Sequence, residues 1–124
     1  MLGAGGALGG AALAAPAAVA ATRGEVALLA TYVAGTAYHH AQEAAATLNA
    51  GDRLVLRREP GNDYDPRAIE VRTRSGAKLG YVPRVDNHAL ASLIDAGFEV
   101  TARIRRITPD RRQPDIRLEV LLTT

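Results

Sequence analysis

The residues best suited to chemistry lie in one short polar stretch, residues 59–69, which reads Glu-Pro-Gly-Asn-Asp-Tyr-Asp-Pro-Arg-Ala-Ile. Asn62, Asp63 and Asp65 carry short side chains that hydrogen-bond the local backbone, and the two prolines fix φ and remove amide donors. A helix cannot run through this stretch, so we predict a specific irregular loop. Its tyrosine, Tyr64, either folds onto the core or offers a flat face to a ligand.

The sequence gives little support for catalysis. The carboxylates of this loop resemble an acid pair, but three neighbouring arginines neutralise the like-charge effect that raises a pKa. These are Arg57, Arg58 and Arg67. The serines, Ser75 and Ser92, stand in a glycine turn and inside an expected helix, and neither is in a nucleophile elbow. We therefore expect a protein that is not an enzyme.

Metal ions and cofactors are not expected either. The chain has no cysteine, which excludes disulfides, thiolate zinc sites and cysteine nucleophiles. His39 and His40 are adjacent and would point to opposite faces of a strand, and the third histidine, His88, is far away in sequence. The glycines between residues 3 and 10 follow no strand and precede no Lys-Ser or Lys-Thr pair, so they form no phosphate loop.

What remains suits binding. Tyr38 and Tyr64 provide stacking faces, and Arg84 provides a phosphate partner. Asn62 and Asp65 add hydrogen-bonding groups. These are the residue types that single-stranded nucleic acid needs. Because the chain has only four tyrosines and one phenylalanine, it cannot build a long stacking track, and the expected site holds a nucleotide or two.

The charge distribution permits a nucleic-acid partner without requiring one. Residues 1–50 hold one of the 15 basic and two of the 13 acidic residues, which leaves 14 basic and 11 acidic residues, a net charge of +3, after Ala50. Such a mixed surface is equally compatible with a simple solvated face.

The first 24 residues form an apolar segment rich in Ala and Gly, with no charged side chain before Arg23. Three interpretations are open: a truncated export signal, a membrane anchor weakened by its glycines and Pro16, or a disordered tail. Only residues 2–21 would associate with a membrane, and the disordered tail would leave the protein cytoplasmic. We predict two parts, the segment 1–24 and one folded domain over 25–124.

Hydrophobic periodicity predicts the elements of that domain. Strands are expected near 28–34, 53–59, 68–73, 77–83, 98–107 and 115–122, with Phe98, Val100, Ala102 and Ile104 facing inward. One or two helical turns are expected over 42–48. A helix over 87–96 would be capped by Asp86 or Asn87 and would end at Gly97. Five to six short strands with one or two short helices predict a mostly β fold, a small, partly open β-barrel.

Three motifs in this order resemble the HIRAN domain, which occurs alone in bacteria and fused to helicase-like remodelling enzymes elsewhere. Val-x-Gly-x-x-Tyr is residues 33–38, and Gly-Asp-x-Leu-x-Leu-x-Arg-Glu-Pro-x-Asn-x-Tyr-Asp-x-x-Ala-Ile-x-Val is residues 51–71. Gly-x-x-Leu-Gly-Tyr-Val-Pro-Arg is residues 76–84. The resemblance covers Val33 to Ile107 and implies a modified barrel, OB-like or SH3-like in shape.

The resemblance also implies a function, the binding of single-stranded DNA by capture of its free 3′-hydroxyl end in a small pocket. The partner would be single-stranded DNA or another nucleic acid, with an ATPase or helicase-like protein as a second partner. The implied roles are base contacts for Tyr38, Tyr64 and Tyr81, a bond from the 3′-hydroxyl to Asp65, pocket shape from Asn62 and a phosphate contact from Arg84. Tyr81 stands where an end-binding member has a histidine.

Two departures from the motif are expected to weaken DNA binding. Ala37 stands where end-binding members have an arginine, and Asp63 replaces a common proline and adds negative charge. Two alternatives therefore remain open. Asn62, Tyr64 and Asp65 would only shape the loop, with Tyr64 packed over Pro66, or the chain would be a protein-interaction or envelope-associated HIRAN-like domain without DNA-end binding.

Overall fold

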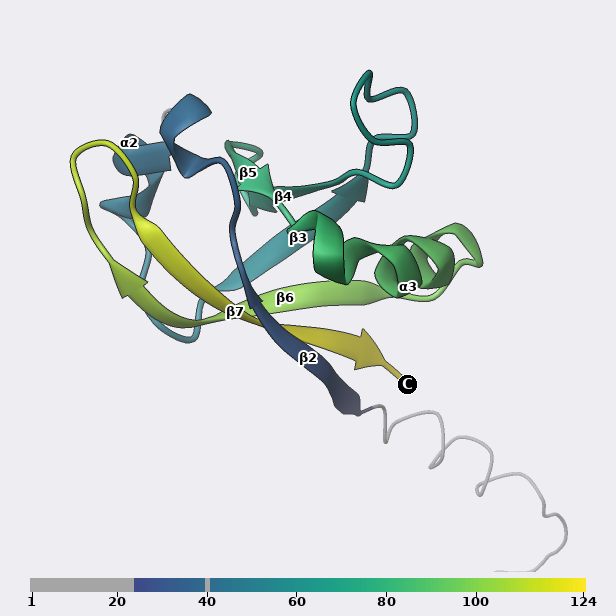
Figure 1. The fold of residues 1–124 in the computed structure, drawn as a ribbon. Helices are drawn as coiled ribbons and strands as arrows, with labels where there is room; N and C mark the ends of the chain where they lie inside the picture. Colours follow the sequence, from purple (N-terminus) through teal and green to yellow (C-terminus); the bar gives the residue numbers. More distant parts are fainter. Residues whose placement is uncertain (1–23, 40) are drawn as a thin grey trace, which may run out of the picture.

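The computed structural model describes residues 24–39 and 41–124 (Figure 1). The interpretations of the apolar segment before Gly24, and of His40, lie outside the described residues. In chain order the elements are β2 (Glu25–Tyr32), the 3-10 helix η1 (Thr36–Tyr38), α2 (Ala41–Ala45), β3 (Arg53–Arg58), β4 (Ile69–Thr73), β5 (Lys78–Tyr81), α3 (Arg84–Asp95), β6 (Val100–Thr108) and β7 (Asp115–Thr123).

The strands form one antiparallel sheet in the order β2-β7-β6-β3-β4-β5. This arrangement confirms the mostly β, OB-like fold with six strands and short helices. The sheet is not fully closed. One isolated bridge joins its two edges, because the Ala34 amide donates to the Tyr81 carbonyl at 2.8 Å and the Tyr81 amide donates to the Ala34 carbonyl at 2.9 Å.

Alternating apolar residues fill the inside of the curved sheet. In β6 and β7 they are Val100, Ala102, Ile104, Ile116, Leu118 and Val120, all of them buried. Leu118 pairs with Ile104 across the ladder, so apolar side chains of neighbouring strands share one face. Leu90 and Ala91 of α3 belong to the same cluster and cover part of the core. Alternation of period two therefore explains both the strands and their register.

The helix α3 begins three residues earlier than predicted, and its expected caps have other roles. Pro83 occupies the N-cap position without a side-chain cap bond. The Asp86 carboxylate accepts from the Thr31 hydroxyl at 2.8 Å, and the Asn87 amide donates to the carboxylate of Asp65 at 2.8 Å. The side chains of Asp86 and Asn87 therefore bond residues distant in sequence, and neither caps the amides at the start of the helix. The expectation of an Asp86 or Asn87 cap was wrong for this reason.

The end of α3 also explains a second correction. Gly97 has φ of 95°, as a helix terminator should, and the Phe98 amide donates to the Leu93 carbonyl at 3.1 Å. Phe98 therefore completes the helix end, lies before β6 and is 53% exposed instead of facing inward. The first strand was also placed too late, since β2 begins at Glu25, where it pairs with Thr123.

Among the described residues, no helix combines the length and the apolar character needed to cross a membrane.

Candidate nucleic-acid interface

A pocket of about 270 Å³ lies where the loop of residues 59–68 meets β5 and the first turn of α3. Its lining residues are Ala34, Asn62, Tyr64, Asp65, Ala68, Tyr81, Val82, Pro83, Arg84 and Asn87. Five of the six side chains predicted from the sequence are in this set, and only Tyr38 is absent from it. Figure 1 shows the loop projecting beyond the ends of β3 and β4, on the same side of the sheet as α3.

Asn62 holds the loop in shape. Its side-chain oxygen accepts from the amides of Tyr64 and Asp65 at 2.8 and 3.0 Å. Its amide nitrogen donates to the carboxylate of Glu59 at 2.7 Å, which is possible because both residues lie in the same turn. Local bonds of this kind compete with regular secondary structure and stabilise a turn. The loop is therefore ordered, as its composition predicted, and it forms one wall of the pocket.

Asp65 is held from both sides. Its Oδ1 accepts from the Arg67 amide at 2.9 Å, and its Oδ2 accepts from the side chain of Asn87 at 2.8 Å. Arg84 places its Nε 3.6 Å from Oδ2. The Arg67 amide, then Asn87, then the positive charge of Arg84 lower the pKa of Asp65 below its ordinary value. The carboxylate is therefore ionised at neutral pH, and each oxygen keeps acceptor capacity beyond its one close bond.

Tyr64 and Arg84 face solvent beside this carboxylate. Tyr64 is 86% exposed, so its ring neither folds onto the core nor is covered by Pro66. The Arg84 side chain is 69% exposed, and its Nη2 donates to the Tyr64 carbonyl, which ties the loop to the start of α3. An exposed aromatic ring, an ionised carboxylate and an exposed guanidinium therefore surround one hollow.

Tyr81 occupies the opposite wall, and its hydroxyl is fully engaged. The hydroxyl donates to Glu59 Oε1 at 2.6 Å and accepts from Lys78 Nζ at 2.6 Å. Lys78 Nζ also lies 4.4 Å from the centroid of the ring, and the ring of His39 meets that of Tyr81 edge-on, with centroids 5.6 Å apart. Bonds from Asn62 and then Tyr81 lower the pKa of Glu59, so the Glu59 carboxylate in this network is ionised at neutral pH.

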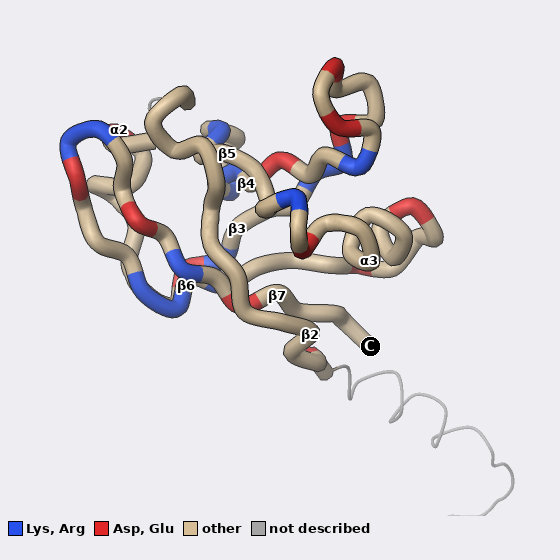
Figure 2. The backbone as a smooth tube through the Cα atoms, viewed as in Figure 1, with Lys and Arg blue, Asp and Glu red and all other residues tan. Residues whose placement is uncertain are grey.

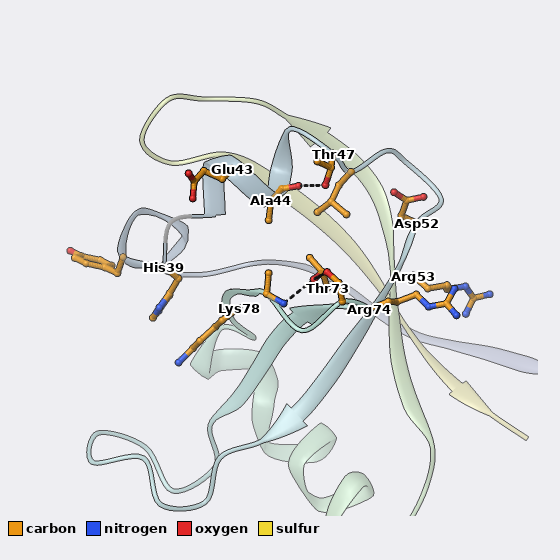
Figure 3. Close-up of a pocket in the computed structure, with 13 residues that line it drawn as sticks. His39, Glu43, Ala44, Thr47, Asp52, Arg53, Thr73, Arg74 and Lys78 are labelled. Atoms are coloured by element: carbon orange, nitrogen blue, oxygen red, sulfur yellow. Dashed lines mark hydrogen bonds between the residues drawn. The ribbon is translucent and has the colours of Figure 1, made fainter.

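Tyr38 belongs to a different hollow. It is 84% exposed and lines a wider depression of about 860 Å³ between the η1–α2 segment and the β4–β5 hairpin (Figure 3). His39, Arg74 and Lys78 line the same depression. Since Lys78 bonds Tyr81, the two hollows meet at the Lys78–Tyr81 contact. The pocket of about 270 Å³ therefore does not include Tyr38, and the base contact that the resemblance implies for Tyr38 stays a prediction.

The sequence did not reveal three residues that support the pocket: Glu59, Lys78 and Asn87. Asn87 is only 3% exposed, and its bond to Asp65 connects α3 to the loop across 22 residues of sequence. The one available signal was an asparagine in the first turn of a predicted helix, which is equally typical of a cap. Within residues 24–39 and 41–124, no group of three or more His, Cys, Asp or Glu side chains could hold a metal ion.

Comparison with known proteins agrees with this architecture. Residues 26–123 match the HIRAN domain family. A crystal structure of a protein from Lactobacillus plantarum is 31% identical and superposes with a TM-score of 0.76 over 82% of this chain and 97% of the other. The crystal structure of the HIRAN domain of human HLTF is 23% identical, with a TM-score of 0.63 over 81% of this chain and 79% of the other.

An NMR structure of the HLTF HIRAN domain is 20% identical, with a TM-score of 0.53 over 80% of this chain and 78% of the other, and shows the same fold. Comparison with curated proteins gives no match. The match over residues 26–123, nearly the whole folded part, carries the assignment. The chain belongs to the HIRAN domain family.

Proposed function

We propose that this chain is a non-catalytic nucleic-acid-binding module that captures the 3′-hydroxyl end of single-stranded DNA in the 270 Å³ pocket. The module comprises residues 25–124. Its proposed contact residues are Asn62, Tyr64, Asp65, Tyr81 and Arg84, with Tyr38 contacting the next part of the strand from the adjoining depression. A module without catalysis would act beside an ATPase or helicase-like partner.

One observation carries the proposal: an ionised carboxylate, an exposed aromatic ring and an exposed guanidinium line one hollow of about 270 Å³. Tyr64 offers its ring for stacking, which is worth about 1–3 kcal/mol per base. Arg84 lies where a backbone phosphate would be neutralised, since the Arg84 side chain is 69% exposed. The pocket thus offers one group for each chemical part of a terminal nucleotide.

Asp65 would distinguish a free end from a continuing or blocked strand. An ionised carboxylate accepts a hydrogen bond from a hydroxyl, and it repels a phosphate at the same position. Arg67 and Asn87 fix the orientation of Asp65, so the carboxylate is in place before the ligand arrives and little side-chain entropy is lost on binding. The 3′-hydroxyl end is therefore the expected ligand, and a 3′-phosphate is expected to bind more weakly.

The two departures from the family motif limit the affinity. Ala37 and Asp63 are both exposed. Ala37 has no charged group that could replace the missing arginine, and Asp63 adds a solvated negative charge near the pocket. Lys78 could supply a positive charge between the two hollows, but Glu70 and Tyr81 already engage its ammonium group. We expect measurable binding at low salt and a steep loss of affinity as salt rises.

Fluorescence anisotropy with a short single strand tests the proposal. A strand with a free 3′ end should bind more tightly than the same strand with a 3′-phosphate. Tyr64→Ala should weaken binding about 5- to 150-fold, the equivalent of one lost stacking contact. Asp65→Ala should weaken binding of the free end and remove the preference for it.

Phe98→Ala is the matched control, because Phe98 is an exposed aromatic residue that does not line the pocket. It should bind the free end like the wild type. Equal affinity for free and phosphorylated ends would disprove capture of the hydroxyl. No binding of either strand at low salt would disprove the nucleic-acid function and favour a protein-interaction domain.

A further inference from the structure

Positive charge is concentrated on the hairpin that joins β6 to β7. Residues 105–117 contain five arginines and two aspartates, a net charge of +3. The other described residues contain nine basic and eleven acidic residues, a net charge of −2, since Arg23 lies outside the described part. Figure 2 shows the basic segments along this hairpin, at the opposite end of the molecule from the projecting loop. The nearly neutral total therefore conceals one strongly basic end.

A bulge brings three of these arginines together. Ile104 pairs with Leu118 and Arg106 pairs with Arg117, so Arg105 is skipped in the ladder. A bulge of this kind turns two successive side chains toward one side of the strand. Arg105, Arg106 and Arg117 all line a hollow of about 560 Å³ together with Tyr32. We call these four residues the arginine surface.

Few acidic groups of the protein balance the positive charge of the arginine surface. Arg106 and Arg117 are directly opposite each other in the ladder, and like charges in that position destabilise a sheet. Arg117 has one ion pair, with Asp115 at 2.9 Å. Neither Arg105 nor Arg106 has a hydrogen-bond or ion-pair partner for its side chain within residues 24–39 and 41–124. An anionic ligand would relieve this repulsion.

Tyr32 adds a flat face to the surface. It is 42% exposed, and the guanidinium carbon of Arg117 lies 5.5 Å from the centroid of its ring. This contact restrains Arg117 while leaving its outward N–H groups able to donate. Asp86, the acidic residue that lines the hollow, is engaged by the Thr31 hydroxyl. The hollow is therefore lined by three positively charged arginines and one carboxylate, Asp86, which already accepts a hydrogen bond from Thr31.

Two segments of the chain connect the arginine surface to the proposed DNA-end pocket. Asp86 lines the hollow and Asn87, the next residue of α3, lines the pocket. The chain connects them a second time, since Tyr32 lines the hollow and Ala34 lines the pocket. Two residues of extended chain span about 7 Å, so Tyr32 and Ala34 lie on neighbouring parts of one segment. A strand that leaves the pocket past Ala34 would therefore meet Tyr32 and Arg117 before the other two arginines.

We propose that the arginine surface binds backbone phosphates of the same nucleic acid whose end occupies the pocket. This inference rests on the proposed function and extends the site to a longer stretch of strand. Arg105 and Arg106 would each neutralise a phosphate, and Arg117 and Tyr32 would support the adjoining nucleotide. The contact is independent of sequence, because guanidinium groups read the phosphodiester and not the base edge.

Two lengths of single strand separate this inference from the proposed function. A strand of about two nucleotides fills the pocket and stops short of β6, which β7 separates from β2, whereas one of about twelve also covers the arginine surface, within the span of a single OB-like domain. The wild type should bind the longer strand more tightly. The double variant Arg105→Gln, Arg106→Gln should weaken binding of the longer strand at least about tenfold at low salt.

The same variant should leave binding of the short strand unchanged. The slope of log K against log salt for the longer strand should fall in magnitude by about 1.4, or about 0.7 for each lost phosphate contact. The glutamines should also raise or preserve the Tm, since they remove like-charge repulsion opposite Arg117.

Arg57→Gln is the matched control for Arg106→Gln. Arg57 is also an exposed strand arginine without a side-chain partner in the described part of the chain, and it lies outside the lining of both hollows. Equal effects of these two single changes would show that only net charge matters and would overturn the inference. So would a double variant that binds the longer strand like the wild type. Failure of the wild type to bind the short strand would instead count against the proposed pocket.

Discussion

Gly80 is the residue on which the closure of the sheet depends most directly. It precedes Tyr81, whose two backbone bonds with Ala34 form the isolated bridge between the edges of the sheet. A Cβ atom at Gly80 would lie 2.2 Å from the Ala34 carbonyl oxygen and 2.8 Å from Val33 Cγ1. Most of what such an atom meets is backbone, which cannot rotate away as a flexible side chain can. Gly80→Ala therefore forces the edges of the sheet apart.

The cost follows from these contacts. Moving the Ala34 carbonyl to an ordinary distance breaks both bridge bonds, at about 1 kcal/mol each. Overpacking against Val33, which is buried, adds about 1–3 kcal/mol. The free energy of unfolding should therefore fall by about 3–5 kcal/mol, a large part of the stability of a small domain. For a domain of this size, that loss lowers the Tm by at least about 12 °C.

Urea denaturation followed by circular dichroism measures this loss, and Gly61→Ala is the matched control. A Cβ at Gly61 would meet nothing within 4 Å, and Gly61 is not among the glycines with positive φ. Gly61→Ala should change the free energy of unfolding by less than about 0.5 kcal/mol. A Gly80→Ala protein within about 1 kcal/mol of the wild type would refute the reasoning, because it would mean that the bridge is not needed for closure.

Two further predictions concern charged groups. Asn87→Ala removes the donor that, after the Arg67 amide, does most to lower the pKa of Asp65. NMR titration should therefore show the pKa of Asp65 rising toward its ordinary value of 3.8. The pKa of Asp110, which depends on other bonds, should stay low and serves as the control. The lowered pKa of Asp65 stabilises the folded state at pH above the unfolded pKa, and this stabilisation is lost as pH falls through the folded pKa. The variant should therefore be less stable than the wild type at neutral pH and approach it in acid. Glu70→Gln should cost about 1–3 kcal/mol in urea denaturation, because the buried Glu70 carboxylate accepts from Arg72 and Lys78 at 3.0 and 3.2 Å; no loss would show that these bonds are replaced by water.

Local pattern was sufficient for most of the fold. Alternation of apolar residues along β6 and β7 predicted two long strands, since a strand places every second side chain on one face. Gly97 predicted the end of α3, because a left-handed residue at that position favours glycine. Asn62 predicted an ordered loop through bonds to amides two and three residues ahead. Each of these features depends on neighbours within a few residues, which is what a sequence displays.

The site needed contacts between distant segments. Asn87 reaches Asp65, and the bridge between Ala34 and Tyr81 connects the two edges of the sheet. Tyr38 lies in the wider depression because η1 and α2 pack beside β5, a placement that no local pattern specifies. At the start of α3, the side chains of Asp86 and Asn87 could bond either the helix amides or distant residues, and they bond the distant residues.

The sequence by itself determined that six strands form and where the helix α3 ends, because propensity and periodicity act over short distances. It also determined that Asn62, Tyr64 and Asp65 share one loop. Only the tertiary structure decided which of the candidate residues meet in one pocket. It also decided that Arg106 stands opposite Arg117, because the register of β6 against β7 and the bulge at Arg105 are set by pairing across the sheet.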